Sequence, residues 1–145
     1  MVHGQDPALK QSVARLLERL DLQPIILHEQ PSRSRALIQK FEDYADVSFA
    51  VVLLTPDDMG YDRNAKAETA RPRARQNVIF ELGFFIGRLG REHVAALFAG
   101  DETFEKPSDY DGVAYIPVDP GGRWQFDLVK ELKAAGIEVD ANKIA

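Results

Sequence analysis

Residues 48–55 read Ser-Phe-Ala-Val-Val-Leu-Leu-Thr, a continuous apolar run rich in valine and leucine. Such a run is typical of a central parallel strand that is covered on both of its faces. Shorter apolar runs at 24–27, 94–98 and 113–118 predict three further strands. Because these runs alternate with amphipathic helical patterns, we expect an α/β domain with a mostly parallel sheet.

Four helices are expected around this sheet. The first begins at Asp6, an N-cap residue followed by proline, and the others are expected at 34–45, 77–87 and 124–135. The apolar stripe of the first helix consists of Leu9, Val13, Leu16, Leu17 and Leu20. The last helix is expected to bury Trp124, Leu128 and Leu132, with Gly136 at its C′ position.

Two segments depart from this regular pattern. Only Met1 and Val2 precede the turn at His3, whereas a strand usually has about five residues. The short first strand suggests that these 145 residues are a single domain cut from a longer chain. Residues 56–73 are polar and have no apolar period, so they form either a functional loop at the carboxyl end of the central strand or a mobile surface loop.

Composition argues against several classes of function. The net charge of −5 makes a nucleic-acid polymer or an acidic membrane surface an unfavourable partner, and no apolar stretch approaches the roughly 20 residues of a membrane span. The absence of cysteine is consistent with a reducing cytoplasm, where we expect the protein. The three histidines lie far apart without metal-ligand spacing, so we expect no metal site.

One acidic residue interrupts the apolar segment 77–87, Asn-Val-Ile-Phe-Glu-Leu-Gly-Phe-Phe-Ile-Gly. This segment predicts a helix that is hydrophobic nearly all round and lies deep in the protein, with Glu81 as its only ionisable side chain. A buried carboxylate costs several kcal/mol unless it is paired, hydrogen-bonded or neutralised. Glu81 therefore either forms an internal salt bridge with Arg88 or Arg75, or takes part in chemistry.

Other candidate residues are expected at the carboxyl edge of the sheet, where open α/β sheets bind ligands. His3 and Gly4 stand where the first strand turns into the first helix, so they are candidates for lining a pocket. Asp57 and Asp58 follow the central strand, where ordinary turn chemistry is the simpler interpretation. The arginines at 33, 35, 71, 73 and 75 either hold phosphates at this edge or form solvated, basic helix starts.

Several stretches resemble one known family. They are VHGQD, IILHEQP, FAVVLLTPDD, SDYDGVAYIP, KELKAAGIEVD and, above all, RARQNVIFELGFFIGRLGRE around Glu81. Across nearly its whole length the chain is similar to the TIR-like predicted nucleotide-binding domains of bacterial anti-phage systems, which are effector domains joined to STING or other cyclic-nucleotide sensors. The resemblance implies a flavodoxin-like TIR fold, with about five parallel strands flanked by helices on both faces.

The resemblance also implies an activity and its residues. Members of the family split NAD+ at the nicotinamide–ribose bond, so NAD+ is a substrate and no cofactor is expected, and Glu81 matches the catalytic glutamate. The implied substrate-binding residues are His3, Gly4, Asp58, Arg75 and Asn77, to which we add Phe84 as an aromatic that stacks on a ring. The loop of Gln30, Pro31, Ser32, Arg33, Ser34 and Arg35 corresponds to the loop that mediates TIR–TIR assembly.

Two other functions stay open at this point. Many TIR folds are non-catalytic modules that only self-associate. A nucleoside deoxyribosyltransferase-like enzyme would also use a glutamate at a glycosidic carbon. The regulation is open as well, because relatives usually have a longer first strand and an attached sensor domain, and this chain shows neither.

Overall fold

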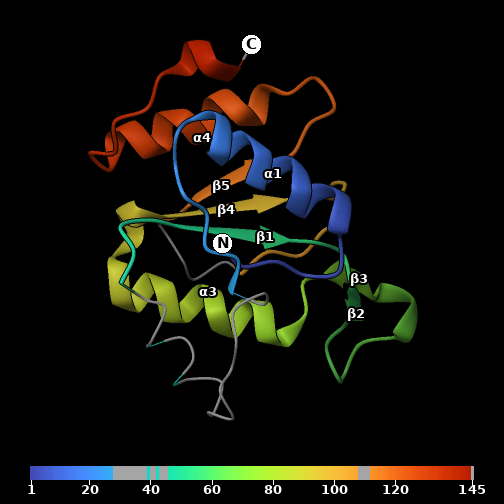
Figure 1. Ribbon diagram of the computed structural model, residues 1–145. Helices are drawn as coiled ribbons and strands as arrows, with labels where there is room; N and C mark the ends of the chain where they lie inside the picture. Colours follow the sequence, from blue (N-terminus) through green and yellow to red (C-terminus); the bar gives the residue numbers. More distant parts are fainter. Residues whose placement is uncertain (28–38, 40–41, 43–45, 108–111, 145) are drawn as a thin grey trace.

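A parallel sheet forms the centre of the computed structural model, which describes residues 1–27, 39, 42, 46–107 and 112–144 (Figure 1). Its strands β1 (Ala50–Leu54), β4 (Val94–Phe98) and β5 (Ala114–Pro117) lie in the order β1-β4-β5. Both pairs are parallel, with Ala50 opposite Val94 and Ala95 opposite Ala114. These strands lie within the runs that the sequence predicts, and the α/β class is confirmed.

Helices cover both faces of this sheet (Figure 1). The helices α1 (Pro7–Arg19) and α4 (Arg123–Ala134) lie on one face, and α3 (Gln76–Leu89) lies on the other. Along β1 the side chains alternate: Val51 and Leu53 belong to the core on the α1 and α4 side, whereas Ala50, Val52 and Leu54 belong to the core on the α3 side. The strand is apolar throughout because each of its two faces packs against helices.

The remaining two expected strands are present only as short hydrogen-bonded segments. Val2 pairs with Val52 in a single parallel bridge, and the amino group of Met1 donates to the Ile25 carbonyl oxygen at 2.6 Å. The Leu27 N–H donates to the Met1 carbonyl oxygen at 3.1 Å, so residues 25–27 run beside the first residues. This places the five segments in the order 2-1-3-4-5 of flavodoxin-like sheets.

The prediction of a regular strand at 24–27 is therefore wrong in detail. Residues 24–26 are not in a regular strand, and Leu27 has a 3-10 conformation. The segment is joined to the first residues by the two hydrogen bonds of Met1, which are too few for a regular ladder. The expected helix at 34–45 and the loop Gln30–Arg35 lie outside the described residues, apart from Gln39 and Glu42.

The polar segment after β1 contains regular secondary structure. It forms an antiparallel hairpin of β2 (Asp58–Gly60) and β3 (Arg71–Arg73), with a short 3-10 helix η2 (Ala67–Thr69) between them. Within the hairpin Asp58 lies opposite Arg73. A Cβ atom at residue 60 would overlap the Arg73 guanidinium, so a larger residue there would displace the end of this flexible side chain. Sequence periodicity missed this hairpin because its strands are only three residues long.

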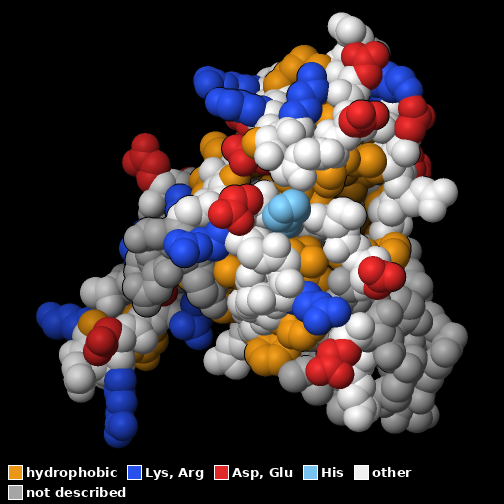
Figure 2. All heavy atoms as spheres, turned by 90° about the vertical axis from the view of Figure 1, so that its left-hand side faces the viewer, with side chains coloured by type: hydrophobic (Ala, Val, Ile, Leu, Met, Phe, Trp, Pro, Cys, Tyr) orange, Lys and Arg blue, Asp and Glu red, His pale blue; other side chains and the backbone are white. Residues whose placement is uncertain are grey.

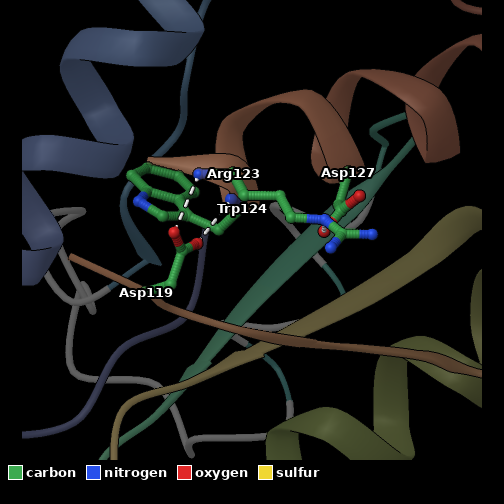
Figure 3. Close-up of polar contacts among 4 residues, drawn as sticks. All are labelled: Asp119, Arg123, Trp124 and Asp127. Carbon is green, nitrogen blue, oxygen red and sulfur yellow. Dashed lines mark hydrogen bonds and ion pairs between the residues drawn. The ribbon is translucent and has the colours of Figure 1, made fainter. Parts of the chain in front are cut away.

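The ends of the helices are held by side chains that the sequence partly identifies. The Asp6 carboxylate accepts a hydrogen bond from the Leu9 N–H at 3.0 Å, which confirms the predicted N-cap of α1. The carboxylate of Asp119 accepts from the N–H groups of Arg123 at 3.0 Å and Trp124 at 2.8 Å, and so caps α4 from the preceding loop (Figure 3). The predicted stripes of α1 and α4 are buried.

The rest of the chain closes the α1 and α4 side. Gly136 follows α4 with a φ of 85°, as its predicted C′ position requires. The final 3-10 helix η4 (Ala141–Ile144) packs Ile144 into the core of that side, and η3 (Arg91–His93) leads into β4. On the face drawn in Figure 2, acidic and basic side chains are interspersed. No helix among the described residues has the length and apolar character needed to cross a membrane.

Candidate functional site

A cavity of about 210 Å³ lies at the carboxyl edge of the sheet. It is bounded by the turn after Val2, the first turn of α1 and the start of α3. Its lining residues are His3, Gly4, Gln5, Pro7, Lys10 and Arg75. The structure thus brings together three of the predicted substrate-binding residues, namely His3, Gly4 and Arg75.

The cavity has the electrostatic character of an anion site. Lys10 of α1 and Arg75 at the start of α3 carry positive charge, and none of the six lining residues is acidic. Arg75 is also the N-cap residue of α3, a helix whose first turn holds no acidic side chain, so the helix dipole adds to the positive potential. Lysine and arginine are the side chains that proteins use to bind phosphate groups.

The turn that forms one wall is held by Asp57. Oδ2 of Asp57 accepts a hydrogen bond from the Gln5 N–H at 3.0 Å and another from the Thr55 hydroxyl at 2.8 Å. A Cβ atom at residue 4 would overlap both Asp57 Oδ2 and Thr55 Oγ1, which explains why Gly4 stands there. The imidazole Nδ1 of His3 lies 2.8 Å from the Gly4 carbonyl oxygen.

Glu81 is fully buried, with 0% of its surface exposed. It lies on the stripe of α3 that faces the sheet, together with Val78, Leu82 and Phe85. The opposite face of α3 meets solvent, since Phe80 is 49% exposed. The expectation that the whole helix lies deep is therefore wrong, because α3 covers a sheet and is not itself covered on all sides.

Neither Arg75 nor Arg88, the two ion-pair partners that the sequence suggests for Glu81, lies on the buried stripe of α3. The Arg88 side chain is exposed, and Arg75 lies at the helix start, about 9 Å along the axis from Glu81 at 1.5 Å per residue.

A different positive group lies near Glu81. Burial lowers the pKa of the Met1 α-amino group from 8.0 to about 6, and the negative charge of Glu81 partly opposes that shift. Glu81 is therefore close to the short first strand on the α3 side of the sheet. It lines none of the three cavities bounded by described residues, so its access to a substrate stays a prediction.

The other predicted site residues lie apart from this cavity. Asn77 is exposed on the first turn of α3, and Asp58 is exposed on β2. Phe84 is half-buried, with its ring 5.2 Å from that of Phe85 in an edge-to-face arrangement. The predicted assembly loop lies outside the described residues.

Two more cavities border the described part of the fold, and neither has this character. One of about 370 Å³ lies at the amino end of β1, opposite the ligand edge, and its lining is mostly apolar with no lysine or arginine. The other, about 280 Å³, lies beside the start of α3 and mixes Arg73 and Lys106 with Glu105. We therefore take the cavity of about 210 Å³ as the candidate site, because it lies at the edge where open α/β sheets bind ligands and its lining carries positive charge.

Sequence reasoning missed three of the lining residues and the role of Asp57. Lys10 follows Pro7 by three residues, so the helical spacing of the predicted α1 could have placed both at the edge. Asp57 follows Thr55 by two residues, a spacing at which a carboxylate and a hydroxyl meet in a turn. Its bond to Gln5 has no local signal, because 52 positions separate the two residues.

Comparison with known proteins places the chain in a family. A family model described as the TIR domain of the CAP12/Pycsar effector protein matches residues 1–120. This is most of the chain, and it includes the candidate cavity, Glu81 and all strands of the sheet. The match confirms the family that the sequence resembles.

Individual relatives agree with this placement. The chain is 49% identical to the uncharacterised protein YuaY of Escherichia coli (strain K12) over 144 residues, which are 99% of this chain and 47% of that protein. It is 32% identical to protein tirC of Dictyostelium discoideum over 125 residues, or 80% of this chain and 61% of that protein. The Pycsar effector protein BcPycTIR of Burkholderia cepacia is 44% identical over 69 residues, or 48% of this chain and 22% of that protein.

The chain thus spans about half the length of YuaY and less than two thirds of tirC. With a family model that covers residues 1–120 and a flavodoxin-like α/β fold, the chain belongs to the family of CAP12/Pycsar effector TIR domains.

Proposed function

We propose that this domain is an NAD+ glycohydrolase that acts as an anti-phage effector, with Glu81 as its catalytic carboxylate. The observation that supports the proposal is the complete burial of Glu81 on the sheet-facing stripe of α3. Membership of a family of Pycsar effectors supports the defence role. A carboxylate that is kept in an apolar core at a cost of several kcal/mol is a candidate for chemistry.

In the proposed reaction the bond between C1′ of the ribose and the nicotinamide nitrogen breaks. Both bonding electrons leave with nicotinamide, which departs as a neutral molecule and needs no proton. Positive charge develops on the ribose, as in other glycosyl transfers, and the Glu81 carboxylate stabilises it electrostatically. Water then attacks C1′, which gives ADP-ribose and releases one proton. One carboxylate suffices because no general acid is required.

The cavity at the carboxyl edge is proposed to hold the pyrophosphate of NAD+. Lys10 and Arg75 supply the positive charge. A dinucleotide bound there would extend its nicotinamide ribose along α3 toward Glu81. Asn77 and Phe84, which lie on the same helix, would then contact the sugar and a ring.

Regulation is proposed to come from assembly and from a sensor. The relatives continue beyond the aligned part, and this chain matches only 22% of BcPycTIR, which leaves room for a cyclic-nucleotide-sensing domain such as STING in a longer protein. The loop Gln30–Arg35 is proposed to mediate TIR–TIR contacts in the cytoplasm. Activity would then require clustering of several domains.

The experiment that tests the proposal measures nicotinamide release from NAD+ by concentrated or artificially clustered protein. Glu81→Gln is nearly isosteric and should abolish NAD+ loss while its circular dichroism spectrum and melting temperature stay close to those of the wild type. Glu18→Gln, at an exposed position on α1, is the matched control and should retain activity. A clustered wild type that never consumes NAD+ contradicts the proposal, and self-association without turnover would identify a scaffold. Turnover of deoxynucleosides in a parallel arm would identify a deoxyribosyltransferase-like enzyme.

A further inference from the structure

We infer that Asp57 is a positioning residue, which holds the turn His3–Gln5 against the sheet and thereby sets the geometry of the anion cavity. This inference rests on the proposed function for its effect on NAD+, but its structural part can be measured independently. Asp57 itself does not line the cavity. Its effect would reach the ligand only through the residues that it holds.

The first step of the argument is the hydrogen bonding of one oxygen. Oδ2 of Asp57 accepts from the Gln5 N–H at 3.0 Å and from the Thr55 hydroxyl at 2.8 Å. Thr55 directly follows β1 and is only 2% exposed, so it is a rigid part of the sheet. The carboxylate therefore joins the turn at residues 3–5 to the end of the central strand.

The second step is steric. Gly4 lies so close to Asp57 and Thr55 that even a Cβ atom would overlap their oxygen atoms. Gly4 is thus in close contact with the Asp57 carboxylate. This contact, together with the hydrogen bonds, sets the distance between the turn and the end of β1. Since His3, Gly4 and Gln5 all line the cavity, the position of Asp57 determines where one of its walls stands.

The third step connects Asp57 to the side of the cavity at the start of α3, where Arg75 lies. Asp57 immediately precedes β2, whose first residue, Asp58, lies opposite Arg73 on β3. Arg73 stands two residues before Arg75, the residue that lines the cavity from the α3 side. The segment Asp57–Arg73 therefore positions both sides of the cavity. The carboxylate of Asp57 holds the turn His3–Gln5, and the pairing of β2 with β3 positions the chain that leads to Arg75.

This arrangement predicts a particular pattern of kinetic effects. A displaced turn would weaken the binding of the pyrophosphate, whereas the chemistry at Glu81, which lies elsewhere on α3, would be less affected. Asp57→Ala should therefore raise KM for NAD+ about tenfold or more, with a smaller effect on kcat. Asp57→Asn retains an oxygen that accepts the same two hydrogen bonds, so it should recover most of that loss.

The experiment combines these kinetics with hydrogen exchange of single backbone amides. In Asp57→Ala the Gln5 amide should exchange faster than in the wild type, whereas the Lys10 amide, which donates to the Asp6 carbonyl oxygen at 3.1 Å within α1, should not change. Asp62→Ala is the matched control, because Asp62 accepts a backbone N–H in the same hairpin, from Asn64, and lines no described cavity. If Asp57→Ala does not fold, Asp57→Glu replaces it, since the longer side chain cannot fit against Gly4.

The outcomes separate this inference from the proposed function. An unchanged Gln5 amide, or a KM within about twofold of the wild type in both Asp57→Ala and Asp57→Glu, overturns the positioning role. A wild type without NAD+ turnover overturns the proposed function instead. In that case the affinity for inorganic pyrophosphate replaces KM as the readout, and a loss of pyrophosphate binding in Asp57→Ala, with faster exchange at Gln5, still supports the positioning role.

Discussion

The carboxylate of Asp119 accepts a hydrogen bond from the backbone N–H of Trp124, with 2.8 Å between Oδ1 and the nitrogen (Figure 3). The other oxygen of the same carboxylate accepts from the Arg123 N–H at 3.0 Å. The first N–H groups of α4 have no partner within the helix, so one side chain from the preceding loop satisfies two of them. The indole of Trp124 is thereby held in the core between α1 and α4.

The capping by Asp119 gives a pH-dependent prediction. Hydrogen bonds from the backbone of Arg123 and Trp124 hold the pKa of Asp119 below its ordinary value of 3.8. Because the folded-state pKa is depressed, its contribution to stability is complete above about pH 4 and is lost as the pH falls through the folded-state pKa. Asp119→Ala should therefore lower the melting temperature at pH 7, and the difference from the wild type should shrink in strong acid. A constant difference across this range would contradict the assignment.

Gly4 is expected to tolerate no side chain. In Gly4→Ala the new methyl group would overlap Asp57 and Thr55, so the turn must shift away from the sheet. We expect a destabilisation of about 1–3 kcal/mol, as for overpacking in a well-packed region, together with weaker NAD+ or pyrophosphate binding. Urea unfolding and a binding titration on the same variant would measure both effects. A fully stable variant with wild-type affinity would show that the turn has free space.

Gly87 provides the opposite case within α3. A Cβ atom at residue 87 would meet nothing within 4 Å, and the position is exposed in the helix interior. Gly87→Ala should stabilise the domain by about 0.5–1 kcal/mol, because alanine loses less backbone entropy on folding into a helix. Chemical denaturation would detect this gain. A loss of stability would mean that the face around residue 87 is packed against something that the described residues do not include.

Lys10 is expected to contribute to anion binding. Lys10→Ala removes one of the two permanent positive charges from the cavity, so it should raise KM for NAD+ about tenfold while leaving stability within about 0.5 kcal/mol. Lys130→Ala, on the exposed face of α4, removes the same charge from the protein without touching the cavity. If both variants change KM equally, the effect comes from overall charge and the cavity is not the phosphate site.

The regular elements were predictable because their signals are local. The apolar run at 48–55, the Asp6-Pro7 start of α1 and Gly136 after α4 each act within a few residues, through alternation of side chains or through hydrogen bonds of one turn. The cores on the two faces of β1 follow from the same alternation. The short strands β2 and β3 were not predicted, because a segment of three residues is too short to show an alternation of apolar and polar side chains.

The candidate site was predictable only in part. His3, Gly4 and Arg75 follow from the rule that the carboxyl ends of parallel strands meet at one edge, and the structure brings them to one cavity. Asp58 and Asp57 are indistinguishable in sequence, yet Asp58 points to solvent and Asp57 holds the turn of Gln5. Alternation along a strand decides which of two adjacent acids faces inward, and the sequence alone does not set that register.

By itself the sequence determined the family, the α/β class and the presence of one acid in an apolar helix. Each of these depends on the order and polarity of residues that are neighbours in the sequence. The tertiary structure decided which face of α3 carries Glu81, which aspartate supports the first turn and how the two short edge segments extend the sheet. Those features depend on contacts between residues that lie some 25 to 50 positions apart, such as Met1 with Ile25 and Gln5 with Asp57, and only the packed chain brings such residues together.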